Sequence, residues 1–355
     1  MIALWFALLC FTIIVFVVLD GWNIGVGTLH FLVARNERER RDIVAALGPL
    51  WSWNEVWLIA AGGTFILAFP MVMAAAFSGF YLALWMVLWS FVLRGISIEV
   101  GGHIADMMWR SFWDFVFAIS NLLLAILFGA ALGNVIRGVP IDASRRFSMA
   151  LFTDFSARGV VGILDWYTMS VAVFATVLLA AHGATYLRLK TTGAVHQRSQ
   201  RCARILWTVT HALFPAISIE TWLVRPELYR AMVDRPAAWI FLAMMAAGGW
   251  ALWSGFVVSG FSRTTGEARA FIGSCLIVAG LLGSAAAAAF PVILHSTLGP
   301  QYSLTAYAGA TTGRGLTIAL IWWPIAAGLA FAYVVPILRK YRGAIGDVAP
   351  DRPFP

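Results

Sequence analysis

Nine stretches of this sequence are apolar over about 20 residues, and this pattern constrains the fold more than any other feature. A helix needs about 20 apolar residues to cross the roughly 30 Å hydrocarbon core of a bilayer. Inside that core the backbone polar groups must be paired, which a helix does within itself. The pattern therefore predicts an all-α membrane protein with about nine transmembrane helices. The expected segments are 2–34, 53–73, 75–95, 113–136, 160–187, 205–224, 239–260, 270–293 and 315–338.

Glycine and proline mark expected irregularities in the first three segments. The first segment is longer than one span and contains Gly21, Gly25 and Gly27, so we expect a kink there. Pro70 alone separates the second segment from the third. Because the gaps between segments are short, we expect one polytopic domain over 1–338, followed by a polar cytoplasmic tail over 339–355.

The composition excludes other classes of protein. Hydrophobic residues make up 61% of the 355 residues and charged residues only 12%, against about a quarter in soluble domains. Disorder requires the opposite composition, and three cysteines cannot build a disulfide scaffold. The net charge is +8, and the basic residues cluster in short gaps between apolar segments, where they set the orientation in the membrane. We therefore do not expect a nucleic-acid partner.

The Lys and Arg residues are distributed unevenly between alternate gaps. The gaps after odd-numbered segments, with the tail, hold seventeen of them, and the other gaps hold eight. Lys and Arg favour cytoplasmic loops. The count therefore predicts a periplasmic N-terminus and a cytoplasmic C-terminus.

Asp20 is the acid that lies deepest in an apolar segment. A carboxylate at membrane depth costs roughly 2.5–3.5 kcal/mol on insertion scales, so it usually faces protein or water. Gly21 and Gly25 have the spacing that lets a second backbone approach, which would bury Asp20 against a neighbouring helix or a partner chain. Asp20 is either a proton-relay carboxyl or a structural hydrogen-bond anchor, and the sequence leaves both open.

Other polar residues stand near the ends of the second and third segments. Glu55, beside Asn54, is either a relay carboxyl between tryptophans or an ordinary acid in the first turn of a helix. Arg94 and Glu99 close the third segment, and their spacing of five is poor for a pair on one helix face. Arg94 either meets an anion or extends its side chain to the membrane surface.

The sequence shows no metal site and no common catalytic motif. Walker A, HExxH, GxSxG and CxxC patterns are missing. His182 and His211 lie in or near segments and could in principle bind a haem, but neither has a partner at helical spacing. We therefore expect all six histidines to be ordinary hydrogen-bonded polar side chains and not ligands of a haem or metal.

Six motifs, in order from residue 20 to about 320, resemble subunit II of the cytochrome bd family of quinol oxidases. The resemblance extends to the cyanide-insensitive type of this family. Each motif alone is weakly specific, whereas six in register are strongly so. They are Asp20–Gly27 (DGWNIGVG), Gly48–Trp57 (GPLWSWNEVW), Ala76–Tyr81 (AFSGFY), Phe128–Pro140 (FGAALGNVIRGVP), GATYL with TTG over 183–193, and FP, HST and SLT over 290–305.

The resemblance implies a respiratory terminal oxidase in a bacterial cytoplasmic membrane. In such an enzyme quinol is oxidised, oxygen is reduced to water, and protons come from the cytoplasm. Haems b and d and the quinol site are expected in the partner, subunit I. This chain would stabilise the haem assembly and contribute to proton and oxygen access. A structural quinone in this chain, a small single-helix subunit and membrane lipid are further expected partners.

The resemblance also assigns candidate roles to residues. Asp20 matches the acid of a DGFDxGVG-type motif and is the candidate proton-entry carboxyl, and Trp57 matches a tryptophan associated with the oxygen route. Arg94 matches an arginine to which the resemblance assigns no role. We treat Arg94, Asn54 and Glu99 as candidates for the subunit interface or for a family motif.

Two departures from the family pattern concern the proton path. Asn23 replaces a second acid, and Ser52-Trp53 replaces Asp-Gly. Ser52 with water, or Glu55, would then have to carry protons. A stand-alone ion-coupled transporter that uses Asp20, and a purely structural scaffold, are the alternatives.

Overall fold

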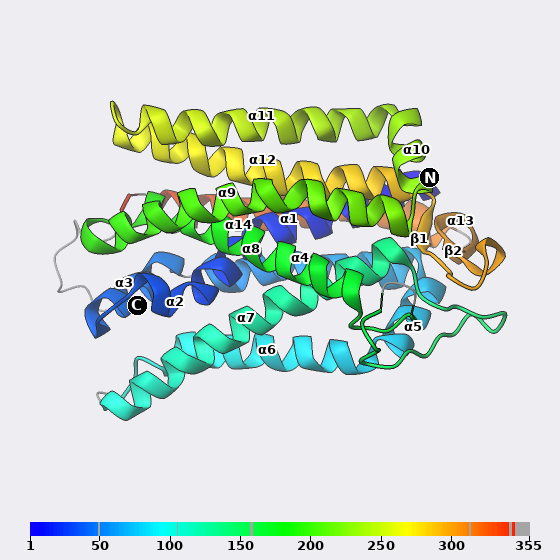
Figure 1. The fold of residues 1–355 in the computed structure, drawn as a ribbon, viewed down its shortest axis with the longest axis horizontal. Coiled ribbons are helices and arrows are strands. Elements are labelled where there is room, and N and C mark those ends of the chain that lie inside the picture. The colour runs from blue at the N-terminus through cyan, green and yellow to red at the C-terminus, as the bar shows by residue number, and fades with distance from the viewer. Residues whose placement is uncertain (49, 105, 157–158, 312–313, 341–342, 345–355) are drawn as a thin grey trace.

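The computed structural model describes residues 1–355 apart from 49, 105, 157–158, 312–313, 341–342 and 345–355. Long helices run along one common axis and lie side by side (Figure 1). The helices are α1 (Ile2–Thr28), α2 (His30–Val33), α3 (Glu37–Leu47), α4 (Leu50–Ala68), α5 (Pro70–Gly79), α6 (Tyr81–Val100), α7 (Met107–Arg137), α8 (Trp166–Lys190), α9 (Gly193–Val224), α10 (Glu227–Asp234), α11 (Pro236–Val258), α12 (Arg263–Ala289), α13 (Ala306–Gly309) and α14 (Gly315–Lys340). Between α12 and α13, strands β1 (Val292–Leu294) and β2 (Leu304–Thr305) pair antiparallel, with a 3-10 turn at Pro300–Tyr302.

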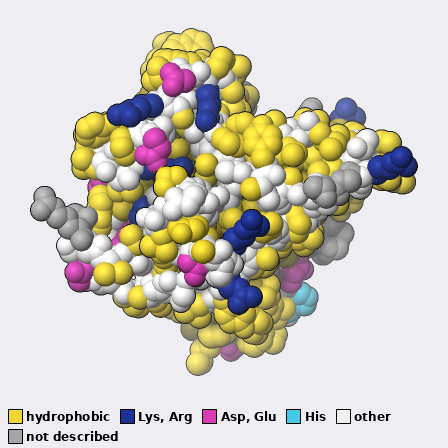
Figure 2. Space-filling model, turned by 90° about the vertical axis from the view of Figure 1, so that its right-hand side faces the viewer, with side chains coloured by type: hydrophobic (Ala, Val, Ile, Leu, Met, Phe, Trp, Pro, Cys, Tyr) yellow, Lys and Arg dark blue, Asp and Glu magenta, His cyan; other side chains and the backbone are white. Residues whose placement is uncertain are grey.

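The two ends of the bundle carry different elements. The β-ribbon end holds the start of α1 together with α10, β1 and β2, and the α3 end holds α2, α3 and the turn between α11 and α12 (Figure 1). Figure 2 looks onto the β-ribbon end, where basic and acidic side chains are scattered among hydrophobic ones. Charged groups at a bundle end suit contact with water. The charge count predicts that the α3 end faces the cytoplasm.

The helices confirm the predicted all-α membrane fold. Within the described residues, eight helices are long and apolar enough to cross a membrane. The number becomes nine if α3 and α4, which meet at a 46° bend, form one broken span. Each of the nine expected segments overlaps one of these helices. The predicted tail over 339–355 lies almost entirely outside the described residues.

The first segment is not broken at its glycines, and a kink there stays a prediction. Helix α1 runs without interruption through Gly21, Gly25 and Gly27 and ends at Thr28. These glycines serve close packing. A Cβ atom on Gly25 would lie 1.9 Å from the carbonyl oxygen of Leu179 in α8, so the two backbones touch. Glycine therefore lets α8 approach α1 beside Asp20, as its spacing predicts.

The second and third segments also end differently from the prediction. Pro70 begins a separate short helix, α5, because proline fits the first turn of a helix but not its interior. The third span then begins at Tyr81 instead of residue 75. Helix α9 begins at Gly193, twelve residues before the expected segment, because its first three turns are too polar for a hydropathy window to include.

Helix α1 lies in the middle of the packing and contacts α4, α7, α8 and α12. Helices α11 and α12 form a tight antiparallel hairpin through small residues, since a Cβ atom on Gly255 would lie 2.5 Å from the backbone nitrogen of Ala270. Helix α14 packs mainly on α4 and leaves most of its side chains exposed. The core thus places polar groups of α1, α4 and α6 next to one another.

Candidate functional site

Arg94 joins two carboxylates that are far apart in the sequence. Its Nη1 atom donates a hydrogen bond of 2.8 Å to Oδ2 of Asp20, and its Nη2 atom donates to Oε1 of Glu55. The three residues come from α6, α1 and α4. Arg94 and Asp20 are completely buried, whereas the Glu55 side chain is 26% exposed. We call these three residues the Arg94 cluster.

The Arg94 cluster lies inside the bundle toward the α3 end. Asp20 is eight residues before the end of α1 at Thr28, Arg94 six before Val100 and Glu55 five after Leu50. At 1.5 Å per residue these separations correspond to about 12, 9 and 8 Å. The cluster is therefore within membrane depth but nearer to the predicted cytoplasmic surface.

Asparagines hold the cluster in place. Nδ2 of Asn23, one turn after Asp20, donates 2.9 Å to Oδ1 of Asp20. Nδ2 of Asn54 donates 2.9 Å to the backbone oxygen of Leu19 and so ties α4 to α1. The family that the sequence motifs resemble often has a second acid at the position of Asn23. In this chain Asn23 supplies a hydrogen-bond donor there instead of a second negative charge. Asp20 therefore accepts a hydrogen bond at both oxygens.

The charges of the Arg94 cluster do not balance. One guanidinium faces two carboxylates, so the cluster has a net charge of −1 when all three groups are ionised. A buried excess charge is costly, and one added proton would neutralise it. Glu55 is the carboxylate at the surface of the chain, and Asp20 is enclosed. The geometry therefore allows Glu55, and not Asp20, to exchange a proton with the surroundings directly.

Ser52 and Glu99 lie on the same helices as Glu55 and Arg94. Ser52 is exposed on α4, one turn before Glu55. Glu99 is exposed on α6 and has no ion pair within the described residues. Its separation from Arg94 agrees with the unfavourable spacing. The extension of Arg94 to the membrane surface is wrong, because its guanidinium is enclosed between two acids.

Trp57 belongs to a group of aromatic rings between α4, α1 and α14. Its ring centre lies 5.9 Å from that of Trp53, 6.1 Å from that of Phe11 and 5.5 Å from that of Phe331. Trp57 is only 3% exposed. The rings make a continuous apolar contact beside the Arg94 cluster, and the oxygen-route role of Trp57 stays a prediction.

The two histidines considered as haem ligands, His182 and His211, do not fit a haem. Both ring nitrogens of His182 are engaged, Nδ1 with the Ser274 hydroxyl at 2.8 Å and Nε2 with the Val18 carbonyl oxygen at 3.0 Å. His211 is exposed on α9, and its Nδ1 atom lies 2.6 Å from the backbone oxygen of Trp207. An axial ligand needs a nitrogen free to bind iron inside an enclosed pocket. The geometry of these two histidines offers none.

Sequence reasoning found each member of the Arg94 cluster but missed that they meet. Nothing in the spacing of residues 20, 55 and 94 indicates contact. It also missed a buried cluster at the β-ribbon end, where Arg137 contacts Asp165 and its Nη2 atom donates 2.6 Å to Oδ1 of Asn134. For Arg94, the available signal was that an arginine inside an apolar segment needs an acidic partner, whereas Arg137 lies just beyond the expected segment 113–136.

Comparison with known proteins gives a consistent result. Residues 1–340 match the family model of cytochrome bd terminal oxidase subunit II. The chain is 29% identical to the probable cytochrome oxidase subunit 2 of Haemophilus influenzae, covering 96% of this chain and 94% of that protein. It is also 29% identical to the cytochrome bd-I ubiquinol oxidase subunit 2 of Escherichia coli strain K12, covering 95% and 91% of the two chains.

A solved structure shares the fold. The bd oxidase of Geobacillus thermodenitrificans contains a chain that superimposes with a TM-score of 0.70 at 17% identity, covering 96% of this chain and 98% of that chain. The matches support a subunit of a membrane-bound oxidase and not a stand-alone transporter. The chain therefore belongs to the cytochrome bd terminal oxidase subunit II family and is a multi-pass inner-membrane subunit of a quinol-oxidising, oxygen-reducing enzyme.

Proposed function

We propose that this chain supplies the Arg94 cluster as a proton-handling site of the oxidase, beside a partner subunit I that carries haems b and d and the quinol site. One observation supports the proposal above the others: two carboxylates share one buried guanidinium, and one of them is accessible. When bound to subunit I, the haems supply the electron transfer and oxygen chemistry. The protons consumed there must be brought through protein.

The two carboxylates have different roles in this proposal. Asp20 is enclosed and held by Arg94 and Asn23, so it acts as a fixed counter-ion that keeps the guanidinium in place. Glu55 takes up the proton that balances the cluster and releases it again when the proton is drawn onward. Ser52, exposed one turn nearer to the start of α4, provides a hydroxyl that can link Glu55 to water.

The exposure of Glu55 also indicates where subunit I packs. A partly exposed carboxylate at membrane depth is unfavourable against lipid and favourable against protein or enclosed water. Helix α14, which packs on α4, leaves large apolar side chains exposed, including Ile321, Trp322 and Leu329. We place the contact with subunit I on α4 and α14, so that Glu55 faces the partner.

Several further assignments are supported by the family resemblance. They are haems b and d in subunit I, a quinone as a structural ligand of this chain, a small single-helix subunit, and cytoplasmic proton uptake. The poor fit of His182 and His211 to haem agrees with the first assignment. Charge asymmetry supports an α3 end inside the cell, which places the Arg94 cluster near the source of protons.

The test compares three variants of the intact complex. Glu55→Gln removes the exchangeable proton, so oxygen consumption with quinol should fall about tenfold or more while haem content stays normal. Asp20→Asn should also lower turnover with haem retained, because it loosens Arg94. Glu99→Gln is the control, since it removes an exposed acid on α6 outside the cluster.

Each result has a clear meaning. Haem content comes from the reduced-minus-oxidised spectrum and turnover from an oxygen electrode. Normal turnover in both Glu55→Gln and Asp20→Asn would refute the proposal and favour a structural scaffold. Loss of haem together with activity in Asp20→Asn would make Asp20 an assembly residue.

A further inference from the structure

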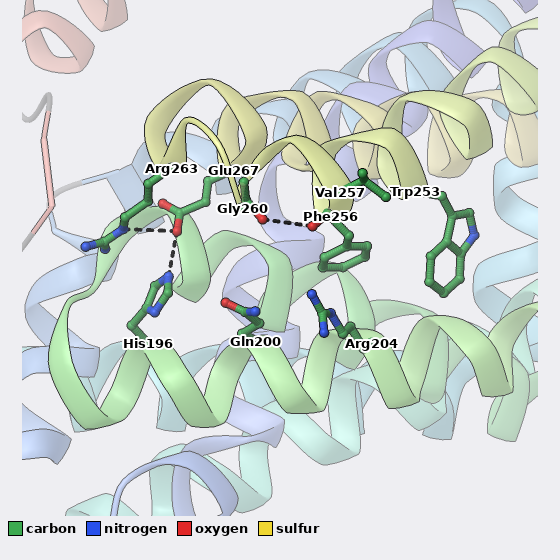
Figure 3. A pocket seen from close by; sticks show the side chains of 10 residues that line it. His196, Gln200, Arg204, Trp253, Phe256, Val257, Gly260, Arg263 and Glu267 are labelled. Carbon is green, nitrogen blue, oxygen red and sulfur yellow. Dashed lines mark hydrogen bonds and ion pairs between the residues drawn. The ribbon is translucent and has the colours of Figure 1, made fainter.

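A cavity of about 730 Å³ lies at the α3 end, between α9 and the α11–α12 hairpin (Figure 3). Its polar lining comes from α9 and α12, and its apolar lining comes from α11. Trp253 and Val257, which are 39% and 68% exposed, leave it open to the outside. The residues that matter below are His196, Gln200, Arg204, Phe256, Arg263 and Glu267.

The only carboxylate lining this cavity is already engaged. Oε1 of Glu267 lies 2.5 Å from Nε2 of His196 and 3.1 Å from Nε of Arg263. Arg263 also donates through Nη2 to the backbone oxygen of Thr191 at 2.8 Å. Figure 3 shows Glu267 directed toward His196 and Arg263, and away from Arg204.

Two other guanidinium groups have no anionic partner. Arg188 of α8 is completely buried, and none of its three side-chain nitrogens has a hydrogen-bond partner within the described residues. The guanidinium of Arg204, which is exposed on α9, makes no hydrogen bond or ion pair with another described residue. Their central carbons lie 4.6 Å and 5.8 Å from the centre of the same Phe256 ring.

These contacts leave an excess of positive charge around the cavity. Arg204 and Arg263 line the cavity, and Arg188 lies behind it against the Phe256 ring. Together with the lining carboxylate of Glu267 these three guanidiniums have a net charge of +2 when His196 is neutral. Two guanidiniums on one ring repel each other, and a buried cation without a partner is costly. A bound anion would relieve both penalties.

The position of the cavity indicates what kind of anion fits. The apolar stretch of α9 begins at residue 205, so Arg204 stands where the polar first turns give way to membrane-spanning sequence. Arg263 is the first residue of α12. Lipid headgroups lie at this level of a membrane, and arginine binds phosphate with several donors at once. Trp253 and Val257 extend the cavity along apolar surface, where acyl chains can pack.

We propose that this cavity binds the phosphate headgroup of an acidic phospholipid, with Arg204 and Gln200 as donors and Arg188 as the buried counter-charge. A net-anionic lipid is favoured over a zwitterionic one because the cavity has a net positive charge. The site lies on α9 and α11, away from the proposed contact of α4 and α14 with subunit I. It is independent of the Arg94 cluster, so either proposal can fail without the other.

Native mass spectrometry of the purified, delipidated oxidase complex tests the proposal. The complex is incubated with phosphatidylglycerol, with phosphatidylcholine of the same acyl chains, or with inorganic phosphate. We expect one phosphatidylglycerol to be retained about tenfold or more tightly than phosphatidylcholine. Arg204→Gln should abolish this preference. Arg269→Gln is the matched control and should keep it, because Arg269 packs on Trp250 outside the cavity.

Three results would overturn the proposal. They are equal retention of the two lipids by the unsubstituted complex, an equal loss in Arg269→Gln, and displacement of phosphatidylglycerol by equimolar inorganic phosphate. The first would show no anion selectivity, the second a general attraction to basic surface, and the third a site for free phosphate. The comparison of lipids on the unsubstituted complex needs no variant, so it decides the question even if Arg204→Gln does not assemble.

Discussion

Substitution of Arg94 by glutamine is the sharpest test of how the buried cluster is held together. Arg94 and Asp20 are both completely buried and joined by a 2.8 Å hydrogen bond. Removing one partner of a buried ion pair typically costs about 3–5 kcal/mol, because the other charge stays buried without compensation. Among the described residues, Asn23 would remain as the side-chain donor to Asp20. We therefore expect Arg94→Gln to cost about 3–5 kcal/mol.

The double variant Asp20→Asn with Arg94→Gln separates charge from packing. It removes both enclosed charges, and Glu55 can be hydrated because it is partly exposed. Most of the lost stability should therefore return. At about 2 °C per kcal/mol for a chain of this size, Arg94→Gln should lower the thermal midpoint by roughly 6–10 °C. The double variant should recover at least about half of that.

The assay is thermal unfolding of the purified complex, followed by tryptophan fluorescence and by haem absorbance. Arg230→Gln, on the exposed side of α10, is the control and should change stability by less than about 0.5 kcal/mol. A double variant as unstable as Arg94→Gln alone would refute the reasoning. The loss would then come from the shape of the arginine side chain and not from an uncompensated charge.

Two further predictions concern packing and the opposite end of the bundle. Gly25→Ala should lower complex yield and thermal midpoint, since its Cβ would fall 1.9 Å from the backbone oxygen of Leu179. Gly21→Ala should do so less, because its Cβ would meet a movable methyl group of Leu179 at 3.0 Å and the His182 ring at an ordinary contact distance of 3.6 Å. Equal effects of the two substitutions would contradict this account. Arg137→Gln should cost about 3 kcal/mol in the same unfolding assay because it leaves Asp165 buried without its cation. Adding Asp165→Asn should restore part of that loss, and no recovery would argue against charge as its cause.

The helices could be predicted from the sequence to different degrees. Length and hydropathy located all nine apolar segments, because burial in lipid imposes the same requirement on each helix separately. The ends were less predictable. Helix α9 begins at Gly193, in a basic stretch that hydropathy assigns to a loop, and the short helix α5 begins at Pro70. Such ends depend on contacts with neighbouring helices as well as on local sequence.

The residues of the candidate site could be predicted from the sequence, but the contacts between them could not. A carboxylate inside an apolar segment singled out Asp20, and polar residues near segment ends added Glu55 and Arg94. Their meeting on one guanidinium could not be predicted, because it depends on how α1, α4 and α6 pack. The unpartnered Arg188 gave no sequence signal at all, since an arginine near a helix end is commonly hydrated.

The sequence by itself determined that this chain crosses a membrane many times, which residues carry charge inside it, and which family motifs it contains. These properties follow from the free energy of placing each residue in lipid or water, which acts residue by residue. Only the tertiary structure decided that Gly25 brings α8 against α1 without breaking α1, and that Asp20 is enclosed while Glu55 is partly exposed. These features depend on distances between helices, which no single segment encodes.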